Sequence, residues 1–266
     1  MKKSLILSLV LMLMFGTVLS LSAAPKRELV TKSFNLSGFD KVSQNWLVDV
    51  EITQAGTTSV QFTGEKKVLD ALSLSVSSDG TLVIKCNQQN WHQQGEAKAL
   101  LKITMPSLTN VAVKGSGDID IKGKFSSDNL SVLIQGSGDV DIESFAGKKF
   151  NASILGAGDI EMTGTVSDVT VDIKGAGDCE IKNVNLNNLT VNIMGAGDVD
   201  LSGTAVNAVY TVKGAGDIDA GSMKAQNVKA SVFGSGDITC YASKSFVSTK
   251  KGTGDIHCKG NAAIRK

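Results

Sequence analysis

The sequence contains very little proline, histidine, arginine and aromatic residue. Of 266 residues, 2 are proline, 2 are histidine and 5% are aromatic, and the two arginines, Arg27 and Arg265, lie near the ends. Carbohydrate modules usually stack sugars on exposed aromatic rings, and polysaccharide lyases commonly use arginine or lysine as the base. The scarcity of aromatic residues therefore argues against a carbohydrate-binding module, and the scarcity of arginine argues against a polysaccharide lyase. A formal net charge of +1 gives no global attraction to nucleic acid, so no nucleic-acid partner is expected.

Long apolar runs are absent after the first residues. Lys2 and Lys3 precede an apolar stretch from about Leu5 to Leu21, and the small residues of "SLSAAPK" follow. This order is typical of a signal peptide, here residues 1–23, with cleavage after Ser22 or Ala23. No second run of about 18 apolar residues follows, so no transmembrane segment is expected in the mature chain. We expect an exported protein in the periplasm, on the outer-membrane surface or secreted.

Glycine, in contrast, is abundant, with 28 residues, and much of it recurs in one phrase. The phrase G-S/A/T-G-D occurs eight times, at intervals of 18 to 21 residues. Its first glycines are Gly115, Gly136, Gly156, Gly175, Gly195, Gly214, Gly234 and Gly252. A period of this size is typical of a solenoid, in which each unit buries its apolar side chains against its neighbours.

Apolar residues alternate with polar ones on both sides of every phrase. Before the first phrase stand Val111 and Val113, and after it stand Ile119 and Ile121. Alternation with a period of two predicts strands and excludes helix. Each unit is therefore expected to be a strand, a tight corner, a second strand and a looser return. Gly123, Gly164, Gly203 and Asn183 mark the return, where a left-handed backbone is easiest for glycine or asparagine.

The predicted fold is all-β, a parallel β-helix with about 20 residues per coil and a rise of about 4.8 Å. Residues 24–107 also alternate, but with longer gaps, and "SSDGT" predicts a turn before Leu82. We expect them to form irregular β coils that lead into the regular eight-repeat helix of residues 108–266, as one continuous domain. Lys250 and Ser248 replace inward apolar residues in the last unit and predict a polar cap.

Cys240 and Cys258 occupy the same column in adjacent coils. Cα atoms about 4.8 Å apart lie within the range that a disulfide can span, so the pair is either a disulfide or two buried thiols.

The repeated phrase has two interpretations. As a corner, its two glycines allow positive φ and close approach of neighbouring backbones, and its aspartate accepts hydrogen bonds from turn amides. As a ligand site, the phrase aspartates and the acidic residues two positions later form a carboxylate band that calcium would neutralise. The calcium candidates are Asp118, Asp120, Asp139, Asp141, Asp159, Glu161, Asp178, Glu180, Asp198, Asp200, Asp217 and Asp219.

Two observations favour the corner over calcium. Lysines directly before the phrase (Lys114, Lys174, Lys213 and Lys251) could neutralise part of the band by ion pairing. The calcium β-roll repeat G-G-x-G-x-D also differs, since it has a period of nine and places its aspartate one residue later. No cofactor is therefore expected, with calcium as the alternative.

The chain resembles a family of exported Bacteroidetes-type proteins described as putative auto-transporter adhesins with a head GIN domain. The resemblance rests on "FNLSGFDKVSQNWLVDVEITQAG", "VLDALSLSVSSDGTLVIKC" and "LKITMPSLTNVAVKGSGDIDI", followed by the serial corners. It implies a right-handed β-helix similar to that of pectin lyases without their catalytic residues, and it implies a role in adhesion.

The expected function is non-enzymatic interaction at the cell surface or in the periplasm, and a polysaccharide lyase-like enzyme is the alternative. Partners would be a protein or a glycan, and the stack end also invites self-association. Trp91, in a polar loop, and Tyr241, the outward aromatic of the repeats, are the candidate contact residues. His92 and His257 are interpreted as a loop residue and a solvated end residue.

Overall fold

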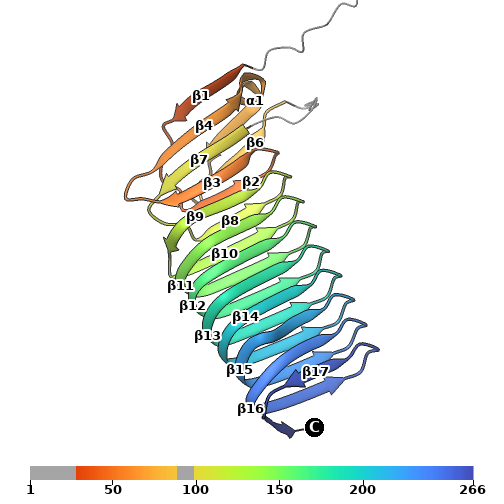
Figure 1. Ribbon diagram of the computed structural model, residues 1–266. Helices are drawn as coiled ribbons and strands as arrows, with labels where there is room; N and C mark the ends of the chain where they lie inside the picture. The colour runs from red at the N-terminus through yellow and green to blue at the C-terminus, as the bar shows by residue number, and fades with distance from the viewer. Residues whose placement is uncertain (1–27, 89–98, 266) are drawn as a thin grey trace, which may run out of the picture.

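Alternating side chains turn each repeat into one coil of a β-solenoid, and the coils stack into an elongated all-β structure (Figure 1). The computed structural model describes residues 28–88 and 99–265. The predicted signal peptide and Trp91 lie outside the described residues. None of the described residues forms a helix long and apolar enough to cross a bilayer.

The strands precede and follow the corners in a regular order. They are β1 (Leu29–Phe34), β2 (Lys41–Gln44), β3 (Asp49–Gln54), β4 (Ser59–Glu65), β5 (Leu72–Val76), β6 (Thr81–Cys86), β7 (Ala99–Met105), β8 (Asn110–Val113), β9 (Ile119–Ser126), β10 (Asn129–Ile134), β11 (Val140–Ile154), β12 (Ile160–Ile173), β13 (Cys179–Ile193), β14 (Val199–Val212), β15 (Ile218–Val232), β16 (Ile238–Lys250), β17 (Ile256–Lys259) and β18 (Ala263–Arg265). One short helix, α1 (Lys66–Ala71), lies between β4 and β5.

The regular coils are parallel and in register. Val140 of β11 pairs with Ile160 of β12, and Ile154 pairs with Ile173. The predicted inward columns are buried, as Ile119, Ile142 and Val171 illustrate with an exposure of 0%. We call the strand segments before each corner, together with the residue directly before the first glycine, from 110–114 and 129–135 to 245–251, the pre-corner face. The segments from the phrase aspartate onward, from 118–122 to 255–259, are the post-corner face.

The interior also contains columns that the repeat did not reveal. Phe125 and Phe145 are fully buried in the returns, Phe150 is fully buried at the beginning of its pre-corner segment, and the rings of Phe145 and Phe150 lie 6.0 Å apart. Coil length varies between 18 and 21 residues, and the register shifts occur in the returns, for example between Ile142 and Phe145. Because these bulges absorb the extra residues, return-side positions do not keep a constant distance from the phrase that precedes them.

The first coils do not stack in the order of the chain, because β2 and β3 lie between later coils. Strand β2 pairs in parallel with both β6 and β8, and β3 pairs in parallel with both β7 and β9. Beyond β7 the sheet continues with β4 and then β1, each paired antiparallel with its neighbour. Strand β5 pairs antiparallel with β6 through the predicted "SSDGT" turn.

Candidate interaction surface along the corners

The corner glycines are required by the close stacking of neighbouring backbones. A Cβ on Gly177 would lie 2.0 Å from the carbonyl oxygen of Gly158, and a Cβ on Gly136 would lie 1.9 Å from that of Gly115. The prediction of close approach is confirmed. The prediction of positive φ at the corners is wrong, because the positive values lie elsewhere. In the repeats they lie in the returns, at Gly123, Gly164, Asn183 and Gly203, and also at Gly260 near the end.

The corner aspartates form a ladder of hydrogen bonds along the stack. The amide of each phrase aspartate donates to Oδ1 of the phrase aspartate one coil earlier, at 2.6 to 2.9 Å. The amide of the following residue donates to an aspartate carbonyl of the next coil, as from Val140 to Asp159 at 2.9 Å. This confirms that the carboxylates satisfy turn amides. The corner interpretation of the phrase therefore explains all eight copies.

Asp49 begins this ladder although no glycine phrase surrounds it. Its Oδ1 accepts the amide of Asp118 at 3.1 Å. Burial raises the pKa of Asp49, the hydrogen bond from Asp118 opposes this, and the charges of Asp118 and Asp120 add to it. The alternation around "VDVEI" was a signal for a strand, but only the position of β3 beneath β9 reveals this role.

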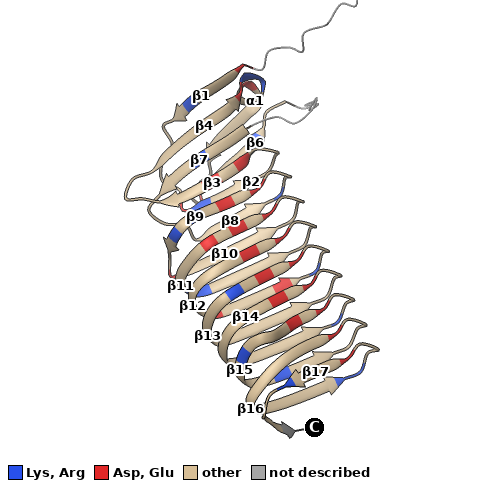
Figure 2. Cartoon of the chain, in the orientation of Figure 1, with Lys and Arg blue, Asp and Glu red and all other residues tan. Residues whose placement is uncertain are grey.

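A second column of carboxylates lies two residues beyond the ladder. Its members are paired in register from strand to strand, and Figure 2 shows acidic residues recurring on successive strands of one face. The column consists of Glu51, Asp120, Asp141, Glu161, Glu180, Asp200 and Asp219. Since paired strands lie about 4.8 Å apart, these like charges repel one another.

Lysines of the same face relieve part of this repulsion. Lys122 Nζ lies 3.4 Å from an oxygen of Asp120, and Lys182 Nζ lies 2.6 Å from Glu180 and 3.1 Å from Glu161. Hydrogen bonds to Glu180 and Glu161 raise the pKa of Lys182. Each of these lysines stands two residues after an acidic residue on the same strand, a spacing that would have identified them.

The lysines that were expected to pair with the band do not reach it. Lys114, Lys174, Lys213 and Lys251 directly precede the corner, where outward side chains belong to the pre-corner face. None of the ion pairs among residues 28–88 and 99–265 involves them. Ion pairing of these four lysines with the band is therefore not observed among the described residues, although Lys250 pairs with Asp255 across the last corner.

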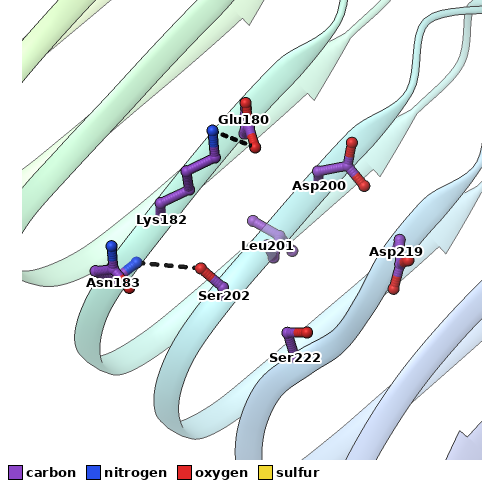
Figure 3. A pocket seen from close by; sticks show the side chains of 8 residues that line it. All are labelled: Glu180, Lys182, Asn183, Asp200, Leu201, Ser202, Asp219 and Ser222. Carbon is purple, nitrogen blue, oxygen red and sulfur yellow. Dashed lines mark hydrogen bonds and ion pairs between the residues drawn. The ribbon is translucent and has the colours of Figure 1, made fainter.

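The post-corner face is hollowed around Asp200, with a volume of about 330 Å³ (Figure 3). Glu180, Lys182 and Asp219 contribute charged side chains to its lining. The carboxylate of Asp200 has no hydrogen bond or ion pair to any described residue, whereas the carboxylate of Asp219 accepts the amide of Gly221 at 2.9 Å. Burial first, and then the negative charge of Asp219, raise the pKa of Asp200.

The structure aligns the twelve predicted calcium ligands in two columns. Among the described residues, however, no group of three or more acidic, histidine or cysteine side chains comes together as a metal site. The ladder carboxylates already accept backbone amides. Calcium binding stays a prediction.

The other candidate residues are dispersed. Cys240 is directly paired with Cys258 in the neighbouring strand, and both are free thiols. Burial raises the pKa of both thiols. Tyr241 is half-buried, and Lys224 Nζ lies over its ring, 4.2 Å from the centroid. The ring face of Tyr241 is therefore already in contact with a cation of the same chain.

Known structures share this architecture. A putative adhesin from Bacteroides fragilis is 28% identical, with 90% of this chain and 92% of that chain covered and a TM-score of 0.50. A putative adhesin from Parabacteroides distasonis is 18% identical over 90% and 98% of the two chains, with a TM-score of 0.69. A putative lipid binding protein from the same species is 22% identical over 90% and 92%, with a TM-score of 0.65. No curated protein sequence matches the chain.

The sequence itself matches one family model over nearly the whole of the repeats and the coils before them. The model is described as putative auto-transporter adhesin, head GIN domain, and it matches residues 38–201 and 182–262. The ladder corners lie within these residues. The chain therefore belongs to the putative auto-transporter adhesin family with a head GIN domain.

Proposed function

We propose that this chain is a non-enzymatic, exported interaction protein that uses its post-corner face to contact a protein or glycan at the cell surface. The observation that carries the proposal is the pair of carboxylate columns, which run in register along successive coils. The hydrogen-bond ladder holds one column rigidly, so little conformational entropy is lost when a partner binds. Extended solenoid faces suit contacts that are spread over several repeats.

The uniformity of the ladder argues against catalysis. Glycoside hydrolysis needs two carboxylates with different environments at a set separation, whereas the ladder aspartates of successive coils all accept the same backbone amide. A lyase-like mechanism would need a base, and Lys182 is the lysine that lines the hollow around Asp200. A general base works best with a pKa near the operating pH, but the pKa of Lys182 is raised by Glu180 and Glu161. This lysine stays protonated.

The test uses the purified mature chain on glycan arrays and on surface-protein extracts, with calcium and with a chelator. We expect saturable binding without product formation, weakened about tenfold by the double variant Asp200→Asn with Asp219→Asn, since about 1.4 kcal/mol corresponds to tenfold. The control is Asn188→Ala with Asn207→Ala on the pre-corner face. Release of sugar products would instead support the lyase-like enzyme. Binding that requires calcium would support the metal prediction.

A further inference from the structure

The two faces that meet at each corner have opposite charge. Over the repeats, the two acidic columns of the post-corner face carry fourteen carboxylates, the eight phrase aspartates and the six members of the second column from Asp120 to Asp219, and Lys122 and Lys182 lie beside them. The outward positions of the pre-corner face carry six lysines and two aspartates. They are Lys114, Lys149, Lys174, Lys213, Lys229 and Lys251, with Asp168 and Asp172. The remaining outward residues of this face are mostly asparagine, serine and threonine.

The same basic face carries exposed apolar side chains in a line. The column directly before the corners contains Leu155, Met194 and Phe233, with exposures of 42%, 45% and 44%. Lys174 and Lys213 separate them, so apolar and cationic side chains alternate from coil to coil. Backbone hydrogen bonds fix this order, since the amide at each position donates to the coil before it at 2.7 to 2.9 Å.

Two further apolar residues lie on the pre-corner face beside this column. Val209 and Val247 are each 37% exposed and lie on either side of Lys229 in another outward column. Of the large exposed apolar residues of the described chain, five therefore lie on this one face. Single exposed apolar residues need no explanation, but a line of them interleaved with lysines marks an interaction site.

We propose that the pre-corner face, with its column of alternating lysine and apolar residues, binds the surface of an anionic lipid bilayer. Exposed leucine, methionine and phenylalanine enter the interface between headgroups and acyl chains, and lysines gain from anionic headgroups. With about 4.8 Å per coil, Leu155, Met194 and Phe233 recur about every 9.6 Å along a straight, rigid edge. A polyanionic glycan would use the lysines alone and leave the apolar side chains in water, so lipid fits better.

This orientation turns the carboxylates away from the membrane. The ladder begins on the far side of the corner, and its aspartates continue the outward alternation of the post-corner face. Repulsion from anionic headgroups therefore favours contact through the pre-corner face alone. The post-corner face stays accessible to a partner, so the two surfaces act independently.

The test is sedimentation with vesicles of phosphatidylcholine alone or mixed with phosphatidylglycerol, with soluble dextran sulfate as a second probe. We expect binding to the mixed vesicles that weakens with salt. The triple variant Leu155→Ser, Met194→Ser and Phe233→Ser should weaken vesicle binding at least about tenfold and leave dextran sulfate binding unchanged. The double variant Lys174→Gln with Lys213→Gln should weaken both, by about tenfold for vesicles.

A matched control removes two exposed lysines from the return side, Lys124→Gln with Lys244→Gln, and should bind vesicles like the wild type. All the substituted side chains are exposed, and circular dichroism with thermal melting verifies that each variant is folded. The proposal is overturned if the wild type does not bind phosphatidylglycerol vesicles, if the triple variant binds them unchanged, or if the control loses as much as the double variant. Wild-type binding to dextran sulfate but not to vesicles would assign the face to anionic polymers.

Discussion

At the scale of single residues, the corner glycines tolerate no side chain, because stacking leaves no room for a Cβ. We expect Gly177→Ala to lower the free energy of unfolding by about 3 kcal/mol or more, since the new methyl group would lie 2.0 Å from the carbonyl oxygen of Gly158. Urea denaturation measures the change. The control is Ala176→Ser at the exposed middle position of the same corner, which should stay within about 0.5 kcal/mol of the wild type. A Gly177→Ala chain as stable as this control would contradict the stacking.

The ladder aspartates illustrate how much a repeated residue can be understood from sequence. Eight corners with the same two glycines and the same aspartate indicated a structural requirement, and the hydrogen bond from Asp198 N to Asp178 Oδ1 supplies it. What the phrase could not indicate was the reason for its glycines, since close approach and positive φ both favour glycine. The distinction needs the position of the neighbouring coil.

At the scale of the acidic column, protonation and folding are linked. The raised pKa of Asp200 means that the folded chain holds this proton more tightly than the unfolded chain. The free energy of unfolding therefore falls as the pH rises from the unfolded value of about 4 through the folded pKa. Asp200→Asn should be more stable than the wild type at pH 7, by less than about 1 kcal/mol because the group is exposed.

The same variant should lose its advantage below about pH 4, where both chains are neutral at this position. Urea denaturation between pH 3 and pH 7 follows the difference. As a comparison, Asp178→Asn weakens an accepted hydrogen bond and should be less stable than the wild type at pH 7. An Asp200→Asn variant that is less stable at pH 7 would show that repulsion does not govern this column.

Which elements were predictable depends on their distance from the phrase. The strands that flank each corner keep constant spacing from it, so their inward and outward residues follow from alternation. The returns contain bulges, and the burial of Phe145, which follows the register shift after Ile142, was missed for that reason. Phe150 stands six residues before its phrase, as Leu130 does, so alternation could have identified it. The prediction that the lysines before the phrase pair with the carboxylates failed for a different reason. Lys114 and Asp118 are close in sequence, yet they lie before and after a corner and belong to different faces.

At the scale of the whole molecule, each coil contacts mainly its two neighbours, so a coil should be removable as a unit. Deleting residues 179–198 joins Asp178, the last residue of one corner, to Val199, the first residue after the corner of the next coil. We expect the shortened chain to fold with unchanged β structure by circular dichroism and a proportionally smaller urea m-value. Deleting residues 179–188 instead breaks the register and should abolish cooperative unfolding. Equal behaviour of the two deletions would contradict the register.

The coil built from β2 and β3 has a consequence for the order in which the molecule assembles. Its neighbours on both sides, β6 with β7 and β8 with β9, come later in the chain. In a chain that is synthesised from its amino end, this first coil therefore lacks one of its two neighbouring coils until the strand that ends at residue 126 has been made. The repeats can then stack on this completed first part of the solenoid, one coil after another.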